Sequence, residues 1–322
     1  MLYLNAAHIE NIGIAWENLV DVIAETVITV DRGDYAQPIK PYLRYGNPNN
    51  RIIAMPAYIG GHHPFAGIKW IASFPDNIFS NKLRANSITI LNEFDTGVPV
   101  CTINTSLLSA IRTASVSGLM VKKYIQFRQQ RGYSVGIVGL GPIGLMHLKM
   151  LKSLLGKSIE RIYLFDIRKV DIEDRDQGLS EDILICGSWE ECYTNSDIFI
   201  ACTVASERYI DRKPKIGSLQ LNVSLRDYKV EVRKYMDVIV VDDWDEVCRQ
   251  NTDIENMQKE TGLEKADTFS MSDFLLHKCP DFENMEKTIM FNPMGMAVFD
   301  IAIGGYYYHE ALKENIGTML PD

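Results

Sequence analysis

The sequence is poor in cysteine, has no long apolar segment and carries fewer basic than acidic residues. Its six cysteines include no C-x-x-C pair, so we expect free thiols in a reducing compartment rather than disulfides. No apolar run approaches the roughly 18 residues that a membrane span requires, and the first residues lack the basic segment of a signal peptide. With 33 Lys and Arg against 42 Asp and Glu, the formal net charge is −9, which argues against nucleic-acid or anionic-membrane partners. We therefore expect a cytoplasmic protein.

Several catalytic motifs are also missing. There is no Walker phosphate loop, no G-x-S-x-G and no zinc-type spacing of Cys and His. The pair His62-His63 follows two glycines and has no patterned carboxylate or cysteine beside it, so we interpret it as a turn and expect no metal. What the chain does have is an ordinary globular composition, 46% hydrophobic and 23% charged, over 322 residues. That length corresponds to about two domains.

The first hundred residues are typical of antiparallel β structure. Strands are predicted over residues 51–59, 65–74, 87–92 and 98–103. The triplet Asp95-Thr96-Gly97 marks a hairpin turn between the last two. Apolar residues then recur at helical spacing from Leu107 to Leu119, which predicts a helix.

From Ser134 on, strands and helices alternate. Further strands are predicted over residues 134–138, 161–165, 183–186, 198–203, 219–223 and 238–241, with a helix over 142–154. This alternation is typical of a parallel sheet covered by helices, which is the α/β class. The acidic stretch 171–182 is predicted to be a loop. A last helix over 296–312 comes too late to continue the sheet, so we expect it to return to the first domain.

The most specific motif is a glycine loop. Residues 139–144 read G-L-G-P-I-G directly after the first of these strands and directly before a helix. In such a G-x-G-x-x-G loop, Gly139 permits the tight turn, Gly141 lets the backbone approach a pyrophosphate, and Gly144 allows close packing of helix on strand. Pro142 and Ile143 open the helix, whose free N–H groups and partial positive charge favour an anion. The loop predicts a dinucleotide-binding domain.

The acid that follows the second strand indicates which dinucleotide binds. Asp166 lies 22 residues beyond Gly144, at the end of strand 161–165. A carboxylate there accepts hydrogen bonds from the adenosine ribose and repels a 2′-phosphate, which favours NAD over NADP. Arg168 and Lys169 could instead flank a 2′-phosphate, so NADP stays open at this point.

Several basic residues of the first part stand among apolar or tightly turning neighbours. They are Lys40, Arg44, Lys69, Arg84 and Arg112. Cations in such positions can bind anionic groups of a substrate. Each could equally be salt-bridged, or cover apolar surface with its alkyl part. Lys69, which has apolar neighbours on both sides, must point either to solvent or into a site.

One carboxylate stands out in the second part. Asp227 lies just past the strand 219–223, at the carboxyl edge where ligands of parallel α/β sheets bind. It could be an acid/base beside a nicotinamide. It could equally cap a helix over residues 228–235. The sequence favours neither alternative.

Six segments along the chain carry a family resemblance. They are Gln37–Arg44 (QPIKPYLR), Arg51–Gly61 (RIIAMPAYIGG), Gly67–Ile71 (GIKWI), Ile111–Ser117 (IRTASVS), Asn292–Ala297 (NPMGMA) and Asn315–Thr318 (NIGT). They resemble the ornithine cyclodeaminase/mu-crystallin family over essentially the whole chain. QPIKPYLR and NPMGMA are similar to the branch of this family that forms 2,3-diaminopropionate.

The resemblance implies an inserted-domain fold. A Rossmann NAD-binding domain, residues 119–296, would be inserted into an α+β substrate-binding and dimerisation domain formed by residues 1–118 and 297–322. This arrangement agrees with the late helix noted above. It also implies a homodimer.

The resemblance further implies residue roles. Lys69 and Arg112 would bind a substrate carboxylate, with Arg44, Lys40 and Arg84 as further substrate-binding cations. Asp227 would be the catalytic acid/base, with Lys69 also in the catalytic set. Thr113, Thr203 and Ser224 would line the nicotinamide and phosphates. Leu225 and Arg226 stand where cyclodeaminases usually carry small residues, which argues against ornithine as the substrate.

The implied reaction is the oxidative cleavage of a secondary amine. NAD⁺ would oxidise N-(2-amino-2-carboxyethyl)-L-glutamate, and water would release 2-oxoglutarate and L-2,3-diaminopropionate for siderophore or peptide-antibiotic biosynthesis. The three carboxylates of this substrate suit the cations of the first domain better than ornithine does. Two alternatives remain: a cyclodeaminase or imine (ketimine) reductase of the same fold, and a non-catalytic dinucleotide-dependent binding protein.

Overall fold

The computed structural model describes residues 1–168, 183–279 and 282–321. The chain forms two compact units, unit 1 from Met1–Val116 with Gly295–Asp322 and unit 2 from Ser117–Met294. The sequence predicted each division two residues later, after 118 and after 296. The chain leaves unit 1 within helix α3 (Leu107–Arg128) and returns to it between strand β15 (Ile289–Asn292) and helix α9 (Ala297–Glu314).

Unit 1 contains a mostly antiparallel sheet in the order β16-β1-β7-β6-β5-β4-β2, with β3 also paired to β4. In that order the strands are β16 (Thr318–Met319), β1 (Leu2–Asn5), β7 (Pro99–Asn104), β6 (Ala85–Glu93), β5 (Phe65–Ser73), β4 (Arg51–Ile59) and β2 (Tyr35–Ala36), with β3 at Tyr42–Leu43. Only the described pair β1–β7 is parallel. Both ends of the chain therefore contribute to one sheet.

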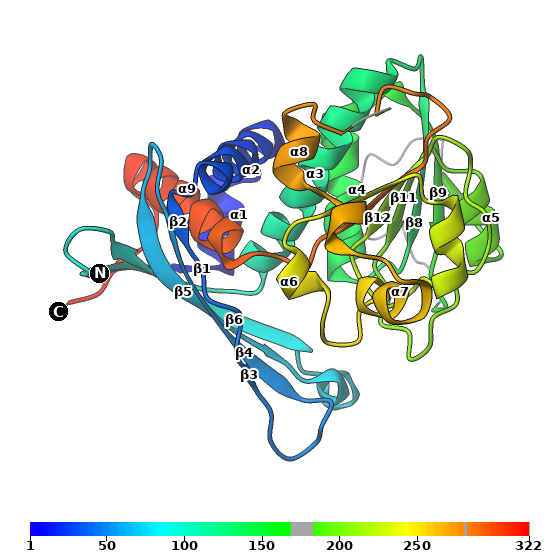
Figure 1. Ribbon diagram of the computed structural model, residues 1–322. Coiled ribbons are helices and arrows are strands. Elements are labelled where there is room, and N and C mark those ends of the chain that lie inside the picture. The colour runs from blue at the N-terminus through cyan, green and yellow to red at the C-terminus, as the bar shows by residue number, and fades with distance from the viewer. Residues whose placement is uncertain (169–182, 280–281, 322) are drawn as a thin grey trace. The chain divides into compact units, whose positions relative to one another are not determined.

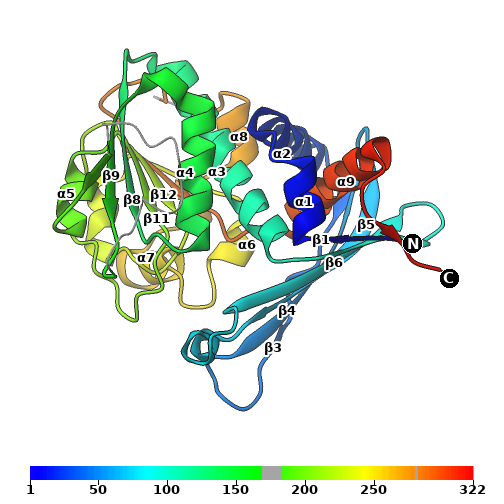
Figure 2. The same cartoon turned by 180° about the vertical axis from the view of Figure 1, so that it is seen from behind.

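Three helices lie on one face of this sheet (Figures 1 and 2). They are α1 (Ala6–Ile12), α2 (Trp16–Asp31) and α9; a 3₁₀ turn, η1, covers Pro75–Ser80. A side chain at Gly305 of α9 would place its Cβ 2.6 Å from the Phe65 ring, so the missing side chain is what allows α9 to approach β5 closely. The helix predicted to return to the first domain is α9.

Unit 2 contains a sheet in which all described strand pairs are parallel. Its order is β10 (Ile183–Ile185), β9 (Ile159–Phe165), β8 (Tyr133–Val138), β11 (Ile198–Ala201), β12 (Leu219–Asn222), β15, β13 (Val238–Val241) and β14 (Phe269–Ser270). The strand order reverses at β8, as in Rossmann folds. The predicted fold class, a Rossmann domain inserted into an α+β domain, is confirmed. The insertion of β15 between β12 and β13 is an addition that the sequence did not reveal.

Helices cover both faces of this sheet, and Figures 1 and 2 show α4 and α5 on opposite sides of it. The helices are α3, α4 (Pro142–Leu155), α5 (Trp189–Thr194), α6 (Trp244–Val247), α7 (Asp253–Thr261) and α8 (Met271–Leu275), with 3₁₀ turns η2 (Gly156–Ser158), η3 (Val230–Tyr235) and η4 (Lys265–Asp267). All residues of β11, β12, β13 and β15 are buried. Such continuous burial explains the unbroken apolar sequences of β11 and β13. Strands β12 and β15 also bury polar residues, which are Gln220, Asn222 and Asn292.

Two sequence predictions have a different outcome. The helix expected over residues 228–235 is the 3₁₀ turn η3, Val230–Tyr235. The loop predicted over residues 171–182 lies outside the described residues. Among the residues that are described, no helix combines the length and apolar character needed to cross a membrane.

Candidate active site

The glycine loop connects β8 to α4 in unit 2. Gly139 has a φ of +92°, and a Cβ there would lie 2.7 Å from the Cys202 carbonyl oxygen. A Cβ on Gly144 would lie 2.0 Å from the Gly139 carbonyl oxygen. Both positions therefore require glycine, one for backbone conformation and one for close packing. A Cβ on Gly141 would meet open space, so a ligand can approach the backbone at this point.

The start of α4 offers unused hydrogen-bond donors. Gly141 is the N-cap residue, no side chain caps the helix, and Pro142 occupies its first turn. The backbone N–H groups around Ile143 can therefore serve an anion, which the helix dipole also favours. The residues present fit the pyrophosphate of a dinucleotide.

Asp166 lies at the end of β9, beside this loop. Its Oδ2 accepts a hydrogen bond from the Leu140 backbone at 2.8 Å, and its Oδ1 accepts from the Arg168 backbone at 2.9 Å. Burial raises the pKa of Asp166, but the hydrogen bonds from Arg168 and Leu140 outweigh it, so the net pKa lies below the ordinary value. The group is an ionised acceptor. The Arg168 side chain pairs with it and is 73% exposed, whereas Lys169 lies outside the described residues.

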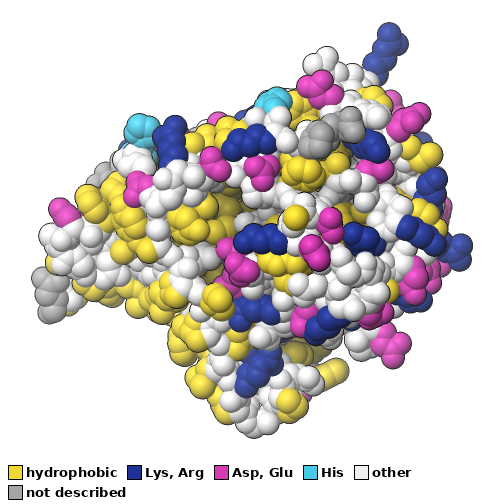
Figure 3. Space-filling view, in the orientation of Figure 1, with side chains coloured by type: hydrophobic (Ala, Val, Ile, Leu, Met, Phe, Trp, Pro, Cys, Tyr) yellow, Lys and Arg dark blue, Asp and Glu magenta, His cyan; other side chains and the backbone are white. Residues whose placement is uncertain are grey.

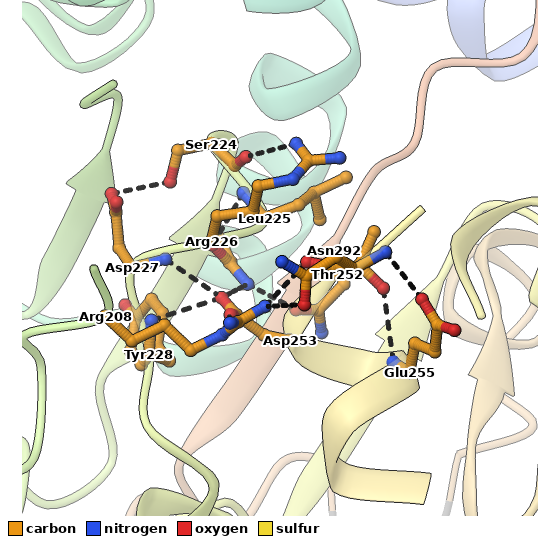
Figure 4. Close-up of polar contacts among 12 residues, drawn as sticks. Arg208, Ser224, Leu225, Arg226, Asp227, Tyr228, Thr252, Asp253, Glu255 and Asn292 are labelled. Carbon is orange, nitrogen blue, oxygen red and sulfur yellow. Dashed lines mark hydrogen bonds and ion pairs between the residues drawn. The ribbon is translucent and has the colours of Figure 1, made fainter. Parts of the chain in front are cut away.

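Asp227 lies at the carboxyl edge of the same sheet, between residues that follow two neighbouring strands. The Thr203 hydroxyl, after β11, donates to its Oδ1 at 2.6 Å. The Ser224 hydroxyl, after β12, donates to its Oδ2 at 2.5 Å (Figure 4). Asp227 is 1% exposed. Thus the structure brings together three residues that the sequence had placed separately.

The environment of Asp227 favours proton uptake. Burial raises its pKa, although the hydrogen bonds from Ser224 and Thr203 act in the opposite direction. The turn η3 is preceded by Lys229 as its N-cap residue and has no side-chain cap. The alternative that Asp227 caps this element is therefore wrong. A buried carboxylate with a raised pKa is suited to accept a proton.

A second cluster of charged side chains lies in unit 1. Lys69 of β5 donates from Nζ to Asp300 Oδ1 at 2.9 Å, and Arg112 of α3 donates from Nε to the same oxygen at 2.9 Å. Lys69 also donates to the Ser109 hydroxyl at 2.7 Å. Asp300 of α9 is fully buried. Lys69 thus points inward, toward the helices.

Lys40 completes this group through the backbone of Gly295. Its Nζ donates to the Gly295 carbonyl oxygen at 3.0 Å. Gly295 has a φ of +85°, and a Cβ there would lie 2.6 Å from Arg112 Nη1. Glycine is needed here because the guanidinium occupies the space of a side chain. We call Lys40, Lys69, Arg112 and Asp300 the cation cluster.

The charges of the cation cluster are linked. Burial, with the nearby charges of Arg112 and Lys40, lowers the pKa of Lys69 to about 8, although Asp300 acts to raise it. Burial alone would raise the pKa of Asp300, but Arg112 and Lys69 hold it below its ordinary value. With Lys69 protonated, Lys69 and Arg112 share the single carboxylate of Asp300, which leaves one positive charge between these three residues. Within the described part of the chain, Arg112 Nη1 and Nη2 donate to no protein acceptor, so they can receive an anion.

Sequence reasoning missed Asp300. It stands between Phe299 and Ile301 in the apolar stretch that forms α9. An acid on the buried side of a helix is rare unless it is paired. That rarity was the available signal, but its partners come from β5 and α3, far away in the sequence.

The remaining predicted residues lie elsewhere. Arg44 is exposed and donates to the Pro48 carbonyl oxygen. Arg84 is half-buried near Arg51, and burial followed by the Arg51 charge lowers its pKa. It precedes Ala85, which pairs with Ser73, four residues from Lys69 or roughly 13 Å along the strand. Thr113 is on α3 in unit 1, where its hydroxyl donates to the Ser109 carbonyl oxygen.

The fold and these clusters define a two-unit protein with an inserted Rossmann domain. The chain belongs to the ornithine cyclodeaminase/mu-crystallin family, whose profile matches residues 3–315, as the resemblance predicted. It is similar to N-((2S)-2-amino-2-carboxyethyl)-L-glutamate dehydrogenase of Staphylococcus aureus, with 34% identity over 337 residues that cover 99% of this chain and 98% of the relative.

Solved structures share the fold. Δ(1)-pyrroline-2-carboxylate reductase of Thermococcus litoralis, in complex with NADH and L-proline, matches with a TM-score of 0.88 and 21% identity, over 99% of this chain and 100% of that one. An archaeal alanine dehydrogenase dimer with bound NAD matches with a TM-score of 0.82 and 20% identity, over 100% and 99% of the two chains. At such identities the likeness establishes the fold.

Proposed function

We propose that the protein is an NAD-dependent dehydrogenase that cleaves N-(2-amino-2-carboxyethyl)-L-glutamate into 2-oxoglutarate and L-2,3-diaminopropionate, for siderophore or peptide-antibiotic biosynthesis. The 34% identity to the Staphylococcus aureus enzyme named for this substrate supports the proposal. The structural observation that carries it is the cation cluster. Two buried cations, Lys69 and Arg112, that share one carboxylate suit a substrate with several carboxylates.

In this proposal the cation cluster binds substrate carboxylates. The Nε edge of Arg112 is held by Asp300, which leaves the edge formed by Nη1 and Nη2 to pair with a carboxylate. Lys69 is held by Asp300 and Ser109 and adds a positive charge that burial makes effective. The substrate has three carboxylates, whereas ornithine has one carboxylate and two ammonium groups. The charge of the cluster favours the former. Arg44 and Arg84 are further candidates for the remaining carboxylates.

We assign NAD to the glycine loop of unit 2. Gly139, Gly141, Pro142, Ile143 and Gly144 would hold the pyrophosphate, since the loop is open at Gly141 and the helix start lacks a cap. The ionised Asp166 would accept the ribose hydroxyls. The residues proposed beside the nicotinamide and phosphates are Thr113, Thr203 and Ser224. When bound, NAD⁺ accepts the hydride that leaves the glutamate Cα.

In this proposal the protein's own residues activate a water molecule and transfer its proton. Loss of hydride from the glutamate Cα converts its C–N bond into a protonated imine. Asp227 takes a proton from water as the oxygen adds to the imine carbon, because a carboxylate with a raised pKa is the stronger base. Asp227 then returns its proton to the nitrogen, the C–N bond breaks, and the added hydroxyl group loses its proton as it becomes the ketone oxygen. The products are 2-oxoglutarate and L-2,3-diaminopropionate.

We also propose that unit 1 is both the substrate-binding and the dimerisation domain. Side chains alternate along a strand, so Trp70, 40% exposed, points away from the helices that Lys69 faces. Figure 3 shows hydrophobic side chains gathered over this unit. The exposed ones include Ile39, Leu43, Tyr45, Ile78, Phe79 and Leu83. An apolar surface of this kind suits a second copy of the chain, so light scattering should report about twice the 36.5 kDa chain mass.

The activity test is NADH formation by the purified protein with four substrates. They are N-(2-amino-2-carboxyethyl)-L-glutamate, called the glutamate conjugate below, L-ornithine, L-proline and L-alanine. The proposal predicts that only the conjugate gives rapid NAD⁺ reduction, with 2-oxoglutarate and 2,3-diaminopropionate formed in equal amounts. Formation of proline and ammonia from ornithine without net NADH would identify a cyclodeaminase, and NADH formation from proline would identify an imine reductase. Dinucleotide binding without any turnover would indicate a binding protein.

A further inference from the structure

The loop that carries Asp227 is held in an unusual backbone conformation. It connects β12 to η3 and contains Leu225, whose φ is +61°. This left-handed conformation is unfavourable for a residue with a branched side chain. The Leu225 side chain is buried in an apolar core cluster of unit 2, which offsets part of the cost. A residue other than glycine keeps a left-handed conformation only where its surroundings stabilise it, so neighbouring residues must hold this loop in place.

A second buried acid, Asp253, contacts this loop directly (Figure 4). Its Oδ2 accepts hydrogen bonds from the backbone N–H groups of Asp227 and Tyr228, both at 3.1 Å. Its own backbone N–H donates to the Leu225 carbonyl oxygen at 2.8 Å. Asp253 therefore contacts the loop at three backbone positions, on both sides of Arg226.

Two further side chains fix the orientation of Asp253. Arg208 donates from Nε to its Oδ1 at 2.6 Å, and Asn222 donates from Nδ2 to its Oδ2 at 3.0 Å. The Asn222 side-chain oxygen also accepts from the Leu225 backbone at 3.1 Å. Asp253 has a fully buried side chain, and it is the first residue of α7. All of these residues belong to unit 2.

We infer that Asp253 is a positioning residue for Asp227: its buried carboxylate holds the loop so that the Asp227 carboxylate meets the Ser224 and Thr203 hydroxyls. This inference rests on the acid/base role proposed above for Asp227. Asp253 reaches Asp227 only through the main chain, so it is not itself a catalytic group. A displacement of the acid/base by about 1 Å is enough to lower turnover by up to about 100-fold.

The test compares Asp253→Asn with a matched control, Asp197→Asn, in the full chain. Asp197 is also a buried acid that accepts a backbone N–H, from Ser134, and pairs with a cation, Lys215. It precedes β11 and therefore lies at the amino end of the sheet, away from the Asp227 loop. Both variants lose a buried charge, but only one affects the loop. The measurements are hydrogen exchange of the Asp227 and Tyr228 amides, kcat, the KM for NAD⁺, and the pH profile of kcat/KM with the glutamate conjugate.

For Asp253→Asn we expect exchange of the Asp227 and Tyr228 amides to accelerate roughly 10-fold or more, because a neutral acceptor binds them less strongly. We expect kcat to fall about 10- to 100-fold while the KM for NAD⁺ stays within about threefold. The acid limb of the pH profile should move to lower pH, since a looser loop admits water and burial is what raises the pKa of Asp227. Asp197→Asn should show none of these changes.

The inference is wrong if Asp253→Asn matches Asp197→Asn in exchange, kcat and pH profile. If Asp253→Asn does not fold, Arg208→Met should give the same changes at smaller size, because it removes the ion pair that orients Asp253 together with the hydrogen bonds from Arg208 to Asn251. Agreement of Arg208→Met with the control would overturn the inference. Asp227→Asn separates the two proposals. Normal turnover by that variant contradicts the proposed chemistry, whereas an inactive Asp227→Asn beside a control-like Asp253→Asn contradicts the positioning role alone.

Discussion

Asp300 in unit 1 and Asp227 in unit 2 are both buried, but their surroundings shift their pKa values in opposite directions. Asp300 in unit 1 shares one oxygen between Lys69 and Arg112, and these cations lower its pKa against the effect of burial. Asp227 in unit 2 meets two hydroxyls and no cation among its described contacts, and its pKa is raised by burial. The two carboxylates differ because two cations outweigh burial at Asp300, whereas burial outweighs the hydroxyl hydrogen bonds at Asp227. These surroundings suit a counter-ion in unit 1 and the proton acceptor that we propose in unit 2.

The largest expected effect comes from replacing Asp300, the counter-ion of Lys69 and Arg112. In Asp300→Asn two buried cations lose their carboxylate, and breaking a buried pair in this way destabilises a protein by about 3–5 kcal/mol. The free energy of unfolding in urea should fall by that amount. Glu310→Gln on the same helix is the control, because Glu310 pairs with the exposed Lys313 and surface pairs contribute about 1 kcal/mol or less. Equal losses in the two variants would contradict the role assigned to Asp300.

Removing the proton acceptor should affect turnover rather than stability. Asp227→Asn keeps the shape of the side chain but not the base, so kcat for the glutamate conjugate should fall by about 100-fold or more. NADH binding, followed by fluorescence, should remain intact. Near-normal turnover would show that another group handles the proton.

Removing one cation should affect substrate binding more than chemistry. Lys69→Met or Arg112→Met deprives a substrate carboxylate of a charge-assisted partner worth about 1.5–3 kcal/mol, so KM for the conjugate should rise roughly 10- to 100-fold. Steady-state kinetics with saturating NAD⁺ measure this rise. Arg161→Met, which changes an exposed cation of unit 2, should leave KM unchanged. A fall in kcat with constant KM would assign these residues to chemistry instead.

The opposite pKa shifts predict a bell-shaped pH profile. Asp227 must be ionised to act as a base, so kcat/KM should fall as pH drops through a pKa above the ordinary carboxyl value. Lys69 must be protonated to attract a carboxylate, so kcat/KM should also fall as pH rises above about 8. Lys69→Met should lose the alkaline limb and keep the acid limb. An unchanged alkaline limb in that variant would assign it to another group.

The smallest effect concerns the choice of dinucleotide. Asp166 should make NAD(H) bind more tightly than NADP(H), because its carboxylate repels a 2′-phosphate. In Asp166→Ser the two affinities should approach each other, with Arg168 freed from its present partner. Titration of both reduced dinucleotides by fluorescence measures the gap. Tighter NADPH binding to the unchanged protein would contradict the assignment.

The local features of this protein were accessible from the sequence. Strand β4 occupies the predicted residues 51–59, and the glycine loop, its preceding strand and its helix lie where the motif placed them. These features depend on neighbours in the chain: alternation of apolar residues, the backbone freedom of Gly139, and the suitability of Pro142 for a first helical turn. The sequence also offered Lys69, Arg112 and Asp227 as candidates, because the two cations stand among apolar neighbours and Asp227 follows a predicted strand.

Contacts between distant segments decided the rest. Nothing near Lys69 in the sequence indicates Asp300, which lies 231 positions away. Nothing near Asp227 in the sequence indicates that Asp253 contacts its loop. Nor does the sequence indicate that the Asp227 carboxylate accepts a hydrogen bond from Thr203 instead of capping a helix. Whether the pKa of a buried carboxyl group is lowered or raised depends on which donors the fold brings within about 3 Å. Water is excluded from those contacts only after the whole sheet has formed. The sequence by itself determined which side chains could be charged; the tertiary structure decided the partners, and with them the pKa of each.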